Sequence, residues 1–187
     1  AIGARTTESQ VHRQLASALP CPVGFKNGTD GNIRVAIDAI LASEASHLFT
    51  APGSQGGMVV IKSEGNPGGH IILRGGTLPN YHQSDVMDAA ERLARQGLNP
   101  RLMVDCSHGN SQKLHQNQLL VAGELCRQLR GGSTAVAAVM IESFLQGGSQ
   151  KPAPLSELQY GLSVTDACLG WEESETLLAM LADAIEA

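Results

Sequence analysis

Short apolar runs alternate along this chain with longer segments of helical periodicity, and this alternation constrains the fold more than any other feature. Apolar runs lie at 1–4, 22–28, 69–76, 101–108 and 135–143, and each leads, directly or after a loop, into a helical pattern. Strands that alternate with helices in this way call for parallel βαβ units with right-handed crossovers. The sequence therefore predicts an α/β fold of about five such units. A whole (β/α)₈ barrel typically needs about 250 residues, so the pattern indicates the second half of one.

Capping residues and helix breakers predict where the helices begin. Asp30 is the expected N-cap of a helix over 31–45, and Ser84 of a helix over 85–97. We expect further helices at 6–17, 111–129 and 174–185, with His115 at the surface of one of them. An antiparallel hairpin is predicted over 47–62, where "PGSQG" joins two β-rich runs.

Composition argues against several functional classes. Hydrophobic residues make up 42% of the 187 residues, the net charge is −5, and Lys and Arg do not cluster, so we expect no nucleic-acid partner. No apolar run approaches the roughly 18 residues of a membrane span. The four cysteines are scattered without a C-x-x-C pair, which favours buried thiols and a reducing cytoplasm. The chain starts without Met or a signal-peptide pattern, so we expect an interior piece of a longer protein.

Polar side chains follow the ends of most predicted strands, which is where a (β/α)₈ barrel places its active site. Arg5, Lys26 and Arg74 are cations that follow three successive strands, and together they could hold a phosphorylated, carboxylated ligand. The alternative for each one is a pairing with a carboxylate at the barrel rim.

A second group of polar residues combines an imidazole with two carboxylates. His108 and Glu142 end the next two apolar runs, and Asp166 lies in the later loop "SVTDACLGW". Such mixed nitrogen and oxygen donors suit a divalent ion such as Mn, Fe, Co or Zn. A hydrogen-bonded rim residue is the simpler interpretation of His108. Glu142 is harder to explain that way, because a carboxylate at the end of an apolar strand needs a partner to offset its desolvation.

The motifs of this chain resemble those of a known enzyme family. The matching segments are "GARTTESQ", "PVGFKNGTDG", "GHIILRGG", "PNY", "DCSHGNSQK", "MIES" and "YGLSVTDACLGWE". Together they are similar to class I 3-deoxy-D-arabino-heptulosonate-7-phosphate (DAHP) synthases, the microbial enzymes that open the shikimate pathway to the aromatic amino acids. The resemblance extends over essentially the whole chain.

The resemblance implies a TIM barrel of which residues 1–187 form strands four to eight as a single domain. It also implies a cytoplasmic transferase that condenses phosphoenolpyruvate with erythrose 4-phosphate and releases inorganic phosphate. By position in the matching motifs, Arg5, Arg74 and the backbone at Ala4 would hold the phosphate of phosphoenolpyruvate. Lys26 would bridge its phosphate and carboxylate.

The resemblance further implies metal ligation by His108, Glu142 and Asp166, with His108 and Lys26 acting in catalysis. Two family features have no counterpart in this chain: a cysteine that is the fourth metal ligand, and a "KPRT"-type loop that binds the sugar phosphate. Both would lie upstream of residue 1. Cys106 does not occupy the context of the missing cysteine.

The predicted hairpin over 47–62 corresponds to a regulatory β-element of the family. Phe49, Ala51 and Ile61 match positions that line an aromatic amino-acid effector pocket, while a simple edge-covering hairpin is the alternative. The resemblance also implies that the full-length enzyme is a homo-oligomer.

Two other functions stay open. The chain could be a catalytically incomplete fragment that only binds phosphate-type ligands or complements an N-terminal half. It could also derive from a related enzyme that condenses phosphoenolpyruvate with another sugar phosphate.

Overall fold

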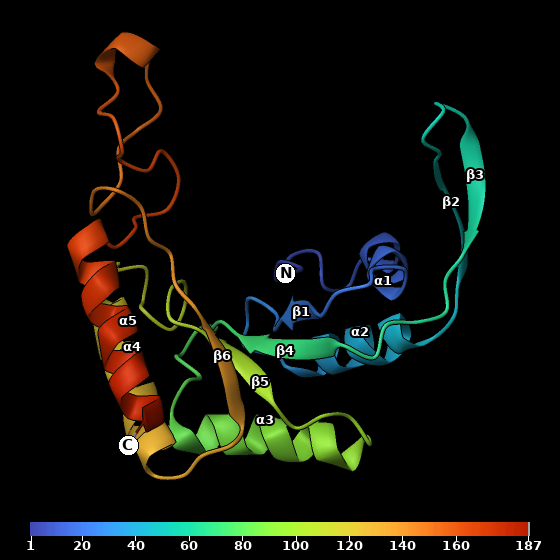
Figure 1. The fold of residues 1–187 in the computed structure, drawn as a ribbon, viewed down its shortest axis with the longest axis horizontal. Coiled ribbons are helices and arrows are strands. Elements are labelled where there is room, and N and C mark those ends of the chain that lie inside the picture. Colours follow the sequence, from blue (N-terminus) through green and yellow to red (C-terminus); the bar gives the residue numbers. More distant parts are fainter. Residues whose placement is uncertain (187) are drawn as a thin grey trace. The chain divides into compact units, whose positions relative to one another are not determined.

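The computed structural model describes residues 1–186 and divides them into two compact units, residues 1–72 and the part from Leu73 onward. Both units combine helices with parallel strand pairs, which confirms the predicted α/β class (Figure 1). No helix in residues 1–186 is long and apolar enough to cross a membrane.

The first unit is built around a pair of parallel strands. Its elements are α1 (Gln10–Ser17), β1 (Val23–Lys26), α2 (Arg34–Glu44), β2 (Leu48–Pro52), β3 (Met58–Lys62) and β4 (Gly69–Leu73). β1 pairs in parallel with β4, so that Phe25 lies opposite Ile71, and both side chains are fully buried. The run at 1–4 forms only a single parallel bridge, from Ile2 to Phe25. α2 packs against both α1 and β1.

β2 and β3 form the predicted antiparallel pair, and Figure 1 shows this ribbon extending away from α1 and α2. Phe49 lies opposite Ile61 in the ribbon, and Ala51 lies two residues further along β2. Alternate residues of a strand and directly paired residues share a face, so these three side chains lie together. Each of them is half-buried, whereas Leu48 on the other face is 69% exposed.

The second unit contains a second parallel strand pair and most of the helices. Its elements are α3 (Gln83–Arg95), β5 (Leu102–Asp105), α4 (Asn117–Arg130), β6 (Val136–Met140), the 3₁₀ turn η1 (Leu155–Glu157) and α5 (Trp171–Glu186). β5 pairs in parallel with β6, with a register shift after Leu102. α4 packs against α5, and Leu125 of α4 and Leu177 of α5 are both fully buried. The long connection from β6 to α5 carries Asp166.

All five helix starts differ from the predictions: α1 begins at Gln10 rather than at residue 6, α5 begins at Trp171 rather than at residue 174, and the other three are as follows. α2 begins only at Arg34, because two side chains accept hydrogen bonds from the backbone ahead of it. The Asp30 carboxylate accepts from the Asn32 N–H, and the side-chain oxygen Oδ1 of Asn32 accepts from the Arg34 N–H. α3 begins at Gln83, with His82 rather than Ser84 at its N-cap. Residues 111–116 form turns ahead of α4, so His115 is not helical as predicted. Side-chain turns before a helix shift its start in this way.

We expect Gly65→Ala to destabilise the first unit strongly. Gly65 has φ +93°, and a Cβ built there would lie 2.0 Å from the carbonyl oxygen of Glu44. Gly56 has a similar φ of +83° but open space around it, so Gly56→Ala is a matched control that carries only the conformational penalty of about 1–2 kcal/mol. Urea unfolding should show that Gly65→Ala lowers the free energy of unfolding by about 3 kcal/mol or more. Equal losses in the two variants would contradict the clash.

Candidate metal centre

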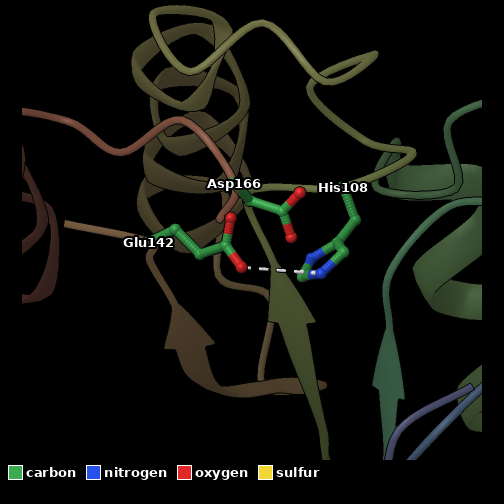
Figure 2. Close-up of side chains that lie close together, drawn as sticks. All are labelled: His108, Glu142 and Asp166. Atoms are coloured by element: carbon green, nitrogen blue, oxygen red, sulfur yellow. Dashed lines mark ion pairs between the residues drawn. The ribbon is translucent and has the colours of Figure 1, made fainter. Parts of the chain in front are cut away.

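The second unit brings the side chains of His108, Glu142 and Asp166 close together. His108 follows β5, Glu142 follows β6, and Asp166 lies in the loop before α5. Each offers one ligand atom within 4.8 Å of the others, and Figure 2 shows the three side chains pointing toward one another. The closest contact joins His108 Nε2 and Glu142 Oε1 at 3.5 Å.

The chemistry of this donor set fits a divalent cation. Two carboxylates and an imidazole nitrogen are ordinary ligands for first-row metals. Ligand atoms about 2.1 Å from one ion lie at most about 4.2 Å apart, so small side-chain movements would place all three donors on a single ion. A cation between Glu142 and Asp166 would also relieve the repulsion of two adjacent carboxylates.

The buried carboxylate of Asp105 orients the His108 ring. Asp105 is fully buried, and its Oδ1 accepts from the backbone N–H and the hydroxyl of Ser107, at 2.9 and 2.5 Å. Its Oδ2 lies 2.9 Å from His108 Nδ1, which is also 2.7 Å from the Ser107 hydroxyl oxygen. The Ser107 hydroxyl donates its only proton to Asp105, so it can only accept from His108 Nδ1. The other neighbour of Nδ1 is a carboxylate oxygen, which also accepts, and Nδ1 must therefore carry the imidazole proton. The lone pair of Nε2 then faces Glu142, as a metal ligand requires.

The loop after β5 holds His108 in an uncommon backbone conformation. Among the non-glycine residues of 1–186, only His108, Gln112 and Lys113 have positive φ, at 53°, 54° and 62°. Lys113 N–H donates to the His108 carbonyl at 2.9 Å and closes the loop. Such left-handed residues cost about 1–3 kcal/mol each and persist only where surrounding contacts determine them.

Buried side chains and glycines supply those contacts. Asn110 donates from Nδ2 to the carbonyls of Leu73 and Asp105, at 3.1 and 2.8 Å. Gly109 N–H donates to the carbonyl of Arg74 at 3.0 Å, and a Cβ on Gly75 would lie 2.5 Å from the backbone nitrogen of Asn110. The segment of Arg74 and the loop of His108 are therefore packed backbone to backbone.

A small cavity of about 50 Å³ lies beside the three candidate ligands. Besides these three, Lys113 and His115 contribute to its lining, together with smaller side chains. Neither residue was predicted at the site from the sequence, since the periodic pattern placed both on a helix over 111–129. The signal that could have found them is their distance of only five to seven residues from His108.

The remaining predicted site residues belong to both units. Ala4, Arg5 and Lys26 lie in the first unit, where the Thr7 hydroxyl donates to the Lys26 carbonyl at 2.8 Å. Arg74 lies in the second unit, directly after β4, and donates to the Gly75 carbonyl at 3.3 Å. Their convergence on one ligand stays a prediction.

The cysteines of residues 1–186 are free, and no disulfide joins them. Cys106 is fully buried, and burial raises the pKa of its thiol to about 12. It therefore stays protonated near neutral pH, unlike a thiolate ligand. Cys126 is buried as well, but Cys168 is only half-buried and Cys21 is exposed. The prediction of buried thiols is thus confirmed for Cys106 and Cys126 and wrong for the other two.

Asp105→Asn should reverse the tautomer of His108. If the amide oxygen keeps the two bonds from Ser107, the NH₂ group faces His108 Nδ1 and donates to it, which moves the ring proton to Nε2. We expect ¹⁵N spectra of histidine-labelled protein to change from the Nδ1–H to the Nε2–H form, and Mn²⁺ affinity to fall about 10–100-fold. Ser107→Ala keeps the carboxylate beside Nδ1 and should keep the tautomer. An unchanged ring spectrum in Asp105→Asn would contradict the proton assignment.

Known proteins similar to this chain agree in name. The sequence matches the DAHP synthetase I family over residues 1–179. A Trp-sensitive phospho-2-dehydro-3-deoxyheptonate aldolase from Enterobacter agglomerans is 58% identical over 185 residues, and its counterpart in Escherichia coli K12 is 56% identical over 186. These matches cover 99% and 100% of this chain and 53% of each relative.

A solved structure supports the same relationship. The phospho-2-dehydro-3-deoxyheptonate aldolase of Francisella tularensis SCHU S4 superimposes with a TM-score of 0.95 at 44% identity, over 99% of this chain and 54% of that one. The chain thus spans about half the length of the relatives that it matches. On the family match and these identities, the chain belongs to the DAHP synthetase I family.

Proposed function

We propose that this chain is the C-terminal half of a DAHP synthase, which condenses phosphoenolpyruvate with erythrose 4-phosphate to DAHP and inorganic phosphate. The observation that carries the proposal is the cluster of His108, Glu142 and Asp166 beyond the strand ends. The names of the relatives support the reaction.

The same proposal assigns residues 1–187 to one domain, strands four to eight of a (β/α)₈ barrel, with the segment 47–62 as an inserted regulatory hairpin. Parallel pairing of β1 with β4 and of β5 with β6 supports a barrel of this kind. The free cysteines of the described residues and the biosynthetic names of the relatives support a cytoplasmic enzyme.

In the proposed mechanism, His108, Glu142 and Asp166 hold a divalent metal. When bound, such an ion supplies Lewis-acid polarisation of the sugar aldehyde or activation of a water. Asp105 keeps the proton of His108 on Nδ1, so that Nε2 is available as a donor. We assign no particular metal among Mn, Fe, Co and Zn.

The cations orient the enol phosphate for attack. Arg5, Arg74 and the Ala4 backbone N–H hold its phosphate, and Lys26 bridges phosphate and carboxylate, so that the enol carbon faces the aldehyde carbon. The new C–C bond forms between those carbons, water adds at C2, and the bond from C2 to the phosphate oxygen breaks. Fixed cations stabilise the charge that develops on the leaving phosphate.

A second candidate function is ligand binding without catalytic turnover. The length of the chain supports this candidate. Because the chain spans about half of its relatives, it would need an N-terminal half for the sugar-phosphate loop and the cysteine ligand. In this proposal the isolated chain binds metal and phosphate-type ligands and becomes active only on complementation.

The metal ligands can be tested directly on the chain. We expect Mn²⁺ to bind with an affinity that His108→Gln and Glu142→Gln each reduce at least about 100-fold, measured by the electron paramagnetic resonance signal of free Mn²⁺. His12→Gln, on α1, is the control and should bind as the wild type does. Phosphate release from phosphoenolpyruvate, erythrose 4-phosphate and Mn²⁺ then separates the two functions. Turnover by the chain alone excludes the binding-only candidate, whereas turnover only with an added N-terminal half supports complementation.

We also propose that the hairpin is part of an effector site in a homo-oligomeric enzyme, and that the effector is tryptophan, since the relatives are named Trp-sensitive. The common face of Phe49, Ala51 and Ile61 supports this assignment.

In the enzyme reconstituted with an N-terminal half, Phe49→Ala should weaken L-tryptophan binding about tenfold or more, because it removes a large apolar contact worth about 1.5 kcal/mol or more. Isothermal titration calorimetry measures this, with Leu48→Ala on the other face as the control. Tighter binding of phenylalanine or tyrosine than of tryptophan would contradict the choice of effector.

A further inference from the structure

Gln118 forms a two-point clamp on the backbone of Glu142. Its side chain, one residue after the start of α4, is fully buried. The side-chain amide donates from Nε2 to the Glu142 carbonyl at 3.0 Å, and its Oε1 accepts from the Glu142 N–H at 2.9 Å. A buried amide is costly unless both of its ends are hydrogen-bonded. Here one residue satisfies the two ends.

The clamp acts where strand pairing has already ended. β6 ends at Met140, so Glu142 lies beyond the part of the chain that the β5–β6 ladder holds. The Gln118 amide engages the same two backbone groups that a neighbouring strand would use. A bond from Leu169 N–H to the Glu142 carbonyl, 2.9 Å long, adds to this support. The peptide groups on both sides of the Glu142 Cα are thereby held, and the direction of its carboxylate with them.

The clamp also links two candidate ligands through one chain segment. His108 lies at the start of the loop after β5, and Gln118 lies ten residues later, where that loop has become α4. The loop between them is closed by the bond from Lys113 N–H to the His108 carbonyl and anchored by Asn117 Nδ2, which donates to the Ser111 carbonyl at 3.0 Å. One β-loop-α segment therefore carries the first ligand at its beginning and holds the second at its end.

We propose that Gln118 is a positioning residue that sets Glu142 in place for the metal before the ion arrives; this inference rests on the metal site proposed above. Asp105 does the same for His108 through the ring nitrogen. Asp166 differs from both, since it is exposed and lies on the long connection before α5. Two ligands are thus preorganised by buried side chains, and the third completes the site from a loop.

The structure offers a matched control on the same helix. Gln128 is also buried in α4, but its amide donates to the Tyr81 carbonyl and to Glu124 Oε1, each at 2.9 Å. Gln118→Met and Gln128→Met remove the same amide from the same helix, with a side chain of similar length. Only the first change removes a bond to a candidate ligand.

Mn²⁺ titration of the chain, with no substrate present, tests the proposal. We expect Gln118→Met to weaken Mn²⁺ binding about 10–100-fold, whereas Gln128→Met leaves it unchanged. Gln118→Glu keeps the acceptor for the Glu142 N–H and loses the donor to the Glu142 carbonyl. Its Mn²⁺ affinity should lie between those of wild type and Gln118→Met.

Hydrogen exchange of the metal-free chain gives a second measurement. The Glu142 amide should exchange faster in Gln118→Met than in wild type or Gln128→Met, because its acceptor is gone. Equal Mn²⁺ affinities of wild type and Gln118→Met would overturn the positioning role, as would equal weakening in both methionine variants. An absence of Mn²⁺ binding in the wild type would instead overturn the proposed metal site, and with it this inference.

Discussion

The contacts of one buried carboxylate, Asp105, determine how the candidate metal centre is built. It ends β5, is fully excluded from solvent, and accepts hydrogen bonds from the backbone N–H and the hydroxyl of Ser107, while its Oδ2 lies 2.9 Å from His108 Nδ1. A buried charge is stable only when it is paired in this way. Because Ser107 and His108 lie only two and three residues after Asp105, the chain must turn sharply after β5 to bring them to its carboxylate. That turn directs His108 Nε2 toward Glu142 and Asp166.

The turn carries a conformational cost that its surroundings offset. Left-handed backbone at His108, Gln112 and Lys113 is unfavourable by about 1–3 kcal/mol for each residue. Hydrogen bonds from Asn110 and the close approach of Gly75 and Gly109 hold the loop in that conformation. The same loop leads into α4, where the Gln118 side chain hydrogen-bonds the backbone of Glu142. Strain, packing and ligand placement are thus consequences of one local structure.

Sequence patterns located the strands and placed candidate ligands at their ends, but they did not locate the helix starts. Apolar runs mark strands because helices cover both faces of a parallel sheet, and a polar residue after the run marks where the strand leaves the buried interior. His108 and Glu142 were visible for this reason. The start of α4 was misplaced by about six residues, since positive φ at Gln112 and Lys113 leaves no compositional sign. His115 was misassigned with it. Gln118 was not noticed at all, because a glutamine on a helix ordinarily faces solvent.

The sequence by itself determined the α/β class, the family and the candidate ligands, because hydrophobic periodicity and long motifs are properties of the chain order. The tertiary structure decided which nitrogen of His108 faces the carboxylates, which side chains hold the ligands, and which thiols are buried. Those features depend on hydrogen bonds between residues that are distant along the chain or folded into an irregular turn. Asp105 and Gln118 act through such bonds, whose geometry exists only after β5, α4 and β6 have packed together.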